Sequence, residues 1–154
     1  TETVRPSNHV GNVMAGKSSN FANELLKLIF NGTPIANLAD NAASSPITNW
    51  ELSLHTALPT SGQNHNEVTY TGYARVPVAR TSAGFVVTGN AVSPANTISF
   101  GACAAGTMTA TYLGLGTAHS GAGSLKYAFP LSPAISIYPG QTPRILNTSV
   151  ISEL

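Results

Sequence analysis

The middle of the chain holds three side chains of types that bind metal ions, His55, His65 and Glu67. Imidazole nitrogen and carboxylate oxygen are both ligands that zinc accepts. His65 and Glu67, however, belong to a polar loop sequence, and no second close pair of ligands accompanies them. We therefore predict that the protein binds no metal and no other cofactor.

Acid–base chemistry is limited by the small number of acids, since Asp and Glu together number 6 in the whole chain. A glycosidase needs two carboxylates that face each other across a groove at about 5–10 Å. Glu51 and Glu67 are the carboxylates of the region with strand periodicity, and we expect each to be a solvated strand residue. A serine triad would depend on Asp40, in a polar linker, and the chain has no G-x-S-x-G elbow.

Cys103 and the glycines after Tyr112 have structural explanations. No base is placed beside Cys103, so a small buried thiol is the expected role, and a single cysteine forms no internal disulfide. This favours folding in a reducing cytoplasm. The glycines between Gly114 and Gly123 follow a strand-like segment and lack the Lys-Ser/Thr of a phosphate-binding loop, so they predict a hairpin with a glycine-rich tip. We predict that the protein is not an enzyme.

One helix is predicted near the start of the chain. Ser18, Ser19 and Asn20 are suitable N-cap residues before the amphipathic run FANELLKLIF, and Gly32 followed by Pro34 ends it. The spacing predicts a helix over 20–31. Residues 1–17 carry few large apolar side chains and no period, so we predict an extended N-terminal arm that contacts a partner.

From Trp50 onward the pattern alternates with a period of two, as in half-buried strands. Trp50, Leu52 and Leu54 share one face, and Glu51, Ser53 and His55 the other. The expected strands are Trp50–His55, Glu67–Tyr70, Tyr73–Ala79, Phe85–Val87, Thr97–Phe100, Met108–Leu115, Leu125–Phe129, Ala134–Tyr138 and Thr142–Leu146. This predicts a mainly β fold, an antiparallel β-sandwich of jelly-roll or Greek-key type with one N-terminal helix, as a single domain over 18–154.

Composition narrows the classes of function. At 154 residues the chain fits one domain with its own core. Charged residues make up 8%, against about 25% in an ordinary soluble domain, and the formal net charge is +1. The basic residues are scattered, which argues against nucleic-acid binding, and no apolar run suits a membrane span. So few charges favour a subunit covered by its neighbours.

The residues from Ser18 to Ile145 resemble a family of small tailed-bacteriophage virion structural proteins, which include capsid-decorating and tail-fibre-like members. The resemblance is carried by SSNFANELLKLIFNGTP, LSLHTALP, TISF and GTAHSGAGSLKY, and above all by NEVTYTGYARV at 66–76. It implies a non-enzymatic virion component that is made in the host bacterial cytoplasm.

Within that class we predict a capsid cement protein that binds the outer surface of the head. Its predicted partners are the major capsid protein and copies of itself, as a dimer or trimer. The expected partner-binding residues are Val4, Arg5, Val10, Val13, Met14, Arg75 and Pro77, because the first five lie in the arm and Pro77 marks an edge strand or a bulge.

Two alternatives remain open. A tail-fibre component would expose tyrosine-rich loops to a host receptor, although the chain has no repeats or low-complexity shaft. A small carbohydrate-binding module would share the fold and the tyrosines, but it would be expected to carry more Trp and Asp than the single Trp50 and Asp40 found here.

Overall fold

The computed structural model describes residues 18–35, 39 and 46–152. Its helix, α1, spans Ser19–Asn31, close to the predicted range. The N-cap is Ser18, whose hydroxyl oxygen accepts a hydrogen bond from the Phe21 amide at 3.2 Å. Gly32 ends the helix in the left-handed region with a φ of 65°, a conformation that glycine adopts without steric cost.

The regular elements in the rest of the described chain are β-strands, as predicted. The strands are β1 (Asn49–His55), β2 (Val76–Ala79), β3 (Phe85–Thr88), β4 (Ala91–Pro94), β5 (Ile98–Ser99), β6 (Met108–Gly116), β7 (Leu125–Ile137), β8 (Arg144–Ile145) and β9 (Ile151–Ser152). They form a four-stranded sheet in the order β2-β1-β6-β7, a three-stranded sheet β3-β4-β9 and a two-stranded sheet β5-β8. Every pairing within these sheets is antiparallel.

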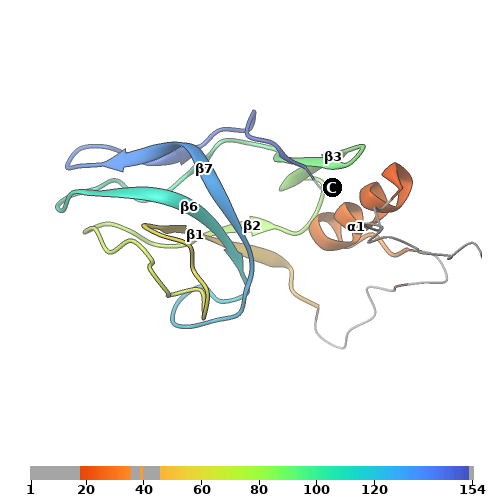
Figure 1. Ribbon diagram of the computed structural model, residues 1–154, viewed down its shortest axis with the longest axis horizontal. Coiled ribbons are helices and arrows are strands. Elements are labelled where there is room, and N and C mark those ends of the chain that lie inside the picture. The colour runs from red at the N-terminus through yellow and green to blue at the C-terminus, as the bar shows by residue number, and fades with distance from the viewer. Residues whose placement is uncertain (1–17, 36–38, 40–45, 153–154) are drawn as a thin grey trace, which may run out of the picture.

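The sheets share one hydrophobic core, to which α1 contributes. Trp50, Leu52 and Leu54 of β1 are buried in it, as their alternation predicted. The helix packs against β3 and β4 at one end of the molecule (Figure 1). There the rings of Phe30 and Phe85 meet edge to face, with centroids 5.0 Å apart. A single core of this kind agrees with a sandwich arrangement; the jelly-roll connectivity stays a prediction.

Several predicted strands differ from the structure. The segment 67–70 is not a strand: Glu67 makes an isolated bridge with His55, and the chain turns at Gly72, whose φ is 102°. The predicted strand 73–79 begins later, at Val76, where pairing with β1 starts. The segments 125–129 and 134–138 form the single strand β7, because pairing with β6 continues beyond Pro130.

Two strands were not predicted, and the glycine-rich hairpin tip begins later than expected. β4 pairs with β3 across the turn at Gly89, and β9 pairs with β4 from the far end of the chain. Gly114 lies within β6, as in the predicted strand Met108–Leu115, and Gly116 extends that strand instead of joining the hairpin tip. The two glycines lie opposite Ser53 and Glu51 of β1. The β6–β7 hairpin itself is present, with residues 117–124 as its connection.

Candidate functional site

The face of β1 that we expected to be solvated is buried. Ser53 and His55 are both 0% exposed, because the segment around 63–75 and the connection 117–124 cover this side of the sheet. Burial of polar side chains has to be offset by hydrogen bonds. A buried polar network satisfies that requirement; it consists of Ser53, His55, Gln63, Glu67, Tyr73 and Arg75.

Ser53 and His55 have the hydrogen-bond pattern of an activated serine. The His55 Nδ1 atom lies 2.9 Å from the His65 carbonyl oxygen, which only accepts, so Nδ1 carries the proton. The Nε2 atom then accepts from the Ser53 hydroxyl at 2.8 Å. Burial lowers the pKa of His55 and so favours its neutral form. Neither side chain reaches solvent, so the pair is enclosed within the fold.

Glu67 and Arg75 form the charged centre of the network. Arg75 Nε and Nη2 each donate to one carboxylate oxygen of Glu67 at 2.7 Å. Nη1 donates to the Ala118 carbonyl at 2.8 Å and Nη2 to the Gly121 carbonyl at 2.6 Å. The hydrogen bonds to the Glu67 carboxylate raise the pKa of Arg75. The ion pair therefore ties the β6–β7 connection to the segment that follows β1.

Tyrosine and glutamine side chains complete the network. The Tyr73 hydroxyl donates to Glu67 at 2.6 Å and accepts from the Leu54 amide at 3.1 Å. Burial, followed by the hydrogen bond to Glu67, raises the pKa of Tyr73. Gln63 Nε2 donates to the Glu51 carbonyl at 2.7 Å, while Gln63 Oε1 accepts from the Ala118 amide at 3.2 Å. Tyr73 and Gln63 therefore each hold the segment that follows β1 to that strand, and Gln63 also holds it to the β6–β7 connection.

The residues considered as metal ligands or nucleophiles are bonded to other groups of the protein. Glu67 is held by Arg75, and His65 Nδ1 accepts from the Thr60 amide at 3.1 Å. In the part of the chain that the structure describes, no three His, Cys, Asp or Glu side chains are arranged to hold a metal ion. Cys103 is 2% exposed, and its thiol lies 3.4 Å from the Gly106 carbonyl.

The predicted partner-binding residues fall into three groups. Pro77 is exposed on β2, which is an edge strand as expected. Arg75 is 5% exposed and its donors are used inside the molecule, so a partner would reach it only if the network opened. The remaining five, Val4, Arg5, Val10, Val13 and Met14, lie outside the described residues.

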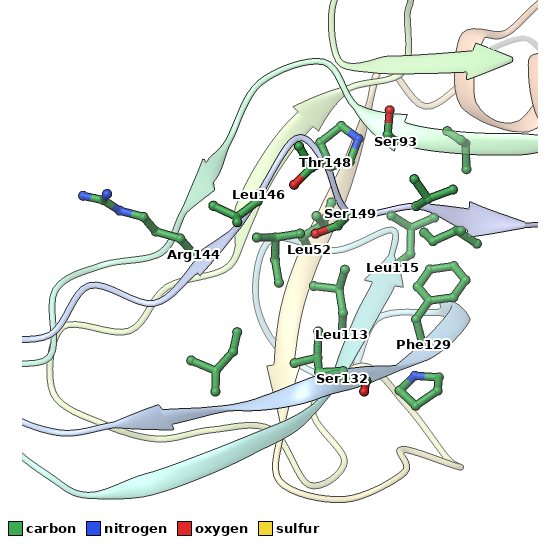
Figure 2. Close-up of a pocket in the computed structure, with 18 of the residues that line it drawn as sticks. Leu52, Ser93, Leu113, Leu115, Phe129, Ser132, Arg144, Leu146, Thr148 and Ser149 are labelled. Atoms are coloured by element: carbon green, nitrogen blue, oxygen red, sulfur yellow. The ribbon is translucent and has the colours of Figure 1, made fainter.

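An apolar cleft lies on the opposite face of the four-stranded sheet. Its volume is about 770 Å³, in the range of ligand pockets. One wall carries Leu52, Leu113, Leu115 and Phe129 of β1, β6 and β7. The other wall is formed by β4 and the segment 144–151, which crosses above Leu52 in Figure 2. The Arg144 side chain at its edge extends away from the apolar residues.

The rim of the cleft contains large exposed apolar side chains. Leu146 is 54% exposed and Val150 is 63% exposed. Neither residue was among the predicted partner contacts. The sequence signal was present in the run ILNTSVI at 145–151, where apolar pairs flank a polar turn, but the periodicity alone did not show that this run borders a cleft.

The aromatic side chains do not assemble into a stacking platform. Trp50 is buried, and its indole N–H donates to the Ile29 carbonyl at 3.2 Å. Tyr70 is buried as well, which raises its pKa to about 12. The Tyr127 ring stacks on Phe129, with centroids 5.5 Å apart. Tyr138, at 54%, is the tyrosine that is mainly exposed to solvent.

Comparison with known proteins gives one family. Residues 16–152 match the sequence profile of a family described as podophage GP4 fiber I protein gp80. A search of curated proteins found no match. No helix in the described ranges is both long and apolar enough to cross a membrane.

Proposed function

Since the chain belongs to the podophage GP4 fiber I protein gp80 family, which its match over residues 16–152 shows, we propose that it is a structural subunit of a bacteriophage fibre. Family membership supports a phage virion structural protein. The fibre assignment rests on the name that the family carries. In this role the protein binds neighbouring virion proteins and performs no reaction.

Structural features support a role in assembly. The polar residues of the buried network are consumed by internal hydrogen bonds, so they fix loops instead of recruiting a substrate. The apolar cleft with its exposed rim, by contrast, offers surface that a protein neighbour would cover. The low charge content of 8% reduces the cost of removing the surface from water.

The capsid cement role that the sequence favoured remains the second candidate. It uses the same domain and the same virion class, with the major capsid protein as partner. The family name fits the fibre alternative at least as well. The carbohydrate-binding alternative receives less support, because Trp50 and Tyr70 are buried.

Gold labelling of virions separates the two virion roles. Antibodies raised against the purified chain are bound to intact phage particles and located by electron microscopy. We expect label on the fibres or at the tail, with an unrelated antibody as the control. Label distributed over the icosahedral head would overturn the fibre proposal in favour of the cement role. Absence of the protein from purified virions would contradict both.

A further inference from the structure

The apolar cleft is too large to be a packing defect. Protein interiors contain few voids larger than a water molecule, whereas this cleft has a volume of about 770 Å³. It is open, since Leu146 and Val150 at its rim are more than half exposed. An open apolar surface of this kind costs free energy in water and gains free energy when another apolar group covers it.

Two edge strands border the cleft. β7 ends the four-stranded sheet and β9 ends the three-stranded sheet. Leu131 of β7 and Ile151 of β9 both line the cleft. A peptide segment that enters here meets apolar side chains from two walls, and it meets strand edges that offer backbone hydrogen bonds.

The first turns of α1 lie beside a hairpin that borders the cleft. Asn23, in the first turns of α1, donates its side-chain amide to the Gly89 carbonyl at 2.5 Å. Gly89 belongs to the turn between β3 and β4, and just beyond it Val92 pairs with Ile151. Val92 and Ile151 both line the cleft. The first turns of α1 therefore contact the β3–β4 hairpin, whose strand β4 also lines the cleft. Figure 1 shows α1 beside β3.

Residues 1–17 have a composition that suits an apolar cleft. The stretch VGNVMA at 10–15 is uncharged and supplies the apolar side chains of Val10, Val13 and Met14. Seventeen residues in extended form reach about 55–60 Å, enough to cross to a neighbouring domain. Charged side chains in this segment, Glu2, Arg5 and Lys17, lie outside that stretch.

We propose that the cleft binds residues 1–17 of a second copy of this chain, with the stretch 10–15 against the apolar walls. The inference rests on the proposed fibre function and names the partner of its site. Because the segment and the cleft are different surfaces of one chain, each copy gives its segment to one neighbour and receives a segment from another. Such heterologous contacts either close into rings or continue as open filaments. A fibre can be built from an open filament or from stacked rings.

Disulfide trapping in the full chain tests this contact. Val13 and Leu146 are replaced together by cysteine, and the purified protein is mildly oxidised and run on a non-reducing gel. Native Cys103 is 2% exposed and adds little background. The matched control pairs Val13→Cys with Leu58→Cys, because Leu58 is 49% exposed and does not line the cleft.

We expect a ladder of covalent dimers and larger species for the Val13–Leu146 pair and much less for the control. An internal disulfide, seen as a monomer that has lost its free thiols, would place the segment in the cleft of its own chain and overturn the proposal. Cross-linking no greater than in the control would overturn it as well. These outcomes are independent of the virion labelling, since they use purified protein.

Sedimentation of charge variants gives a second readout. Leu146→Asp places a carboxylate on the rim, and its matched control is Leu58→Asp. We expect Leu146→Asp to weaken self-association of the full chain at least about tenfold, which corresponds to about 1.4 kcal/mol, and Leu58→Asp to leave it nearly unchanged. Circular dichroism verifies that both variants are folded. Equal association of the two variants, or a parent chain that stays monomeric, would contradict the proposal.

Discussion

Arg75 and Glu67 lie eight residues apart in the sequence and form a two-bond ion pair inside the protein, at 2.7 Å for each bond. Their side chains are 3% and 13% exposed. The other N–H groups of Arg75 donate to carbonyls of the β6–β7 connection, so the pair holds that connection to the segment between β1 and β2. Removing either partner would leave the other charge buried and unpaired, which lowers the free energy of unfolding.

We predict that Glu67→Gln lowers the free energy of unfolding by about 3–5 kcal/mol, because Arg75 is left as a buried charge without its counter-ion. Urea unfolding measures this loss. The matched control is Glu51→Gln, whose partner His119 has a side chain that is 65% exposed. The control is expected to change stability by less than about 1 kcal/mol. Equal losses in the two variants would show that the buried pair contributes no more than a pair whose basic partner is exposed and whose Glu51 side chain is 12% exposed.

Gly114 is predicted to tolerate no side chain. A Cβ atom there would lie 2.6 Å from the Ser53 hydroxyl oxygen and would also strike His55 Nε2. Gly114→Ala should therefore displace a buried hydrogen-bonded pair and cost about 2–4 kcal/mol in thermal or urea unfolding. Gly121→Ala is the control, because its Cβ would meet nothing within 4 Å and only its φ of 74° opposes the change. If Gly114→Ala cost no more than the control, β1 and β6 would have to separate at little cost.

Stability is predicted to fall in mild acid because of His55. Burial lowers the pKa of His55 in the folded state below its ordinary value of 6.5, so the unfolded chain takes up a proton first. The contribution of His55 is then complete above pH 6.5 and declines as the pH falls from there toward the folded-state pKa. The measurement is the free energy of unfolding in urea between about pH 8 and about pH 5.5.

His55→Gln should flatten this pH dependence, whatever its effect on absolute stability. His119→Gln, at an exposed position, is the matched control for the loss of a histidine. A slope that persists in His55→Gln would assign the acid sensitivity to another group.

Local sequence was sufficient for the elements whose ends and faces are set by neighbouring residues. The helix over 20–31 was predictable because Ser18 caps its first turn and Gly32 supplies the left-handed end. The strand with Trp50, Leu52 and Leu54 was predictable from its alternation, because one face enters a core. The buried role of Cys103 followed from its small neighbours and the absence of a base.

Long-range contacts were decisive elsewhere. Strand β9 has two residues and exists because β4 lies beside it, so no local pattern marks it. The face of β1 with Ser53 and His55 alternates like a solvated face, yet distant loops cover it. A polar side chain on a strand can face solvent or enter a buried hydrogen-bond network. The local sequence does not distinguish the two, because the partners in the network come from other segments.

The sequence by itself determined a β-rich domain with one capped helix, few charges and no local motif for a reaction, because these properties depend on residue types and short spacings. The tertiary structure decided that Glu67 and Arg75 face inward to each other and that Leu52, Leu113 and Leu146 border a cleft. Those relationships join residues from separate strands, and folding alone brings such residues within contact distance.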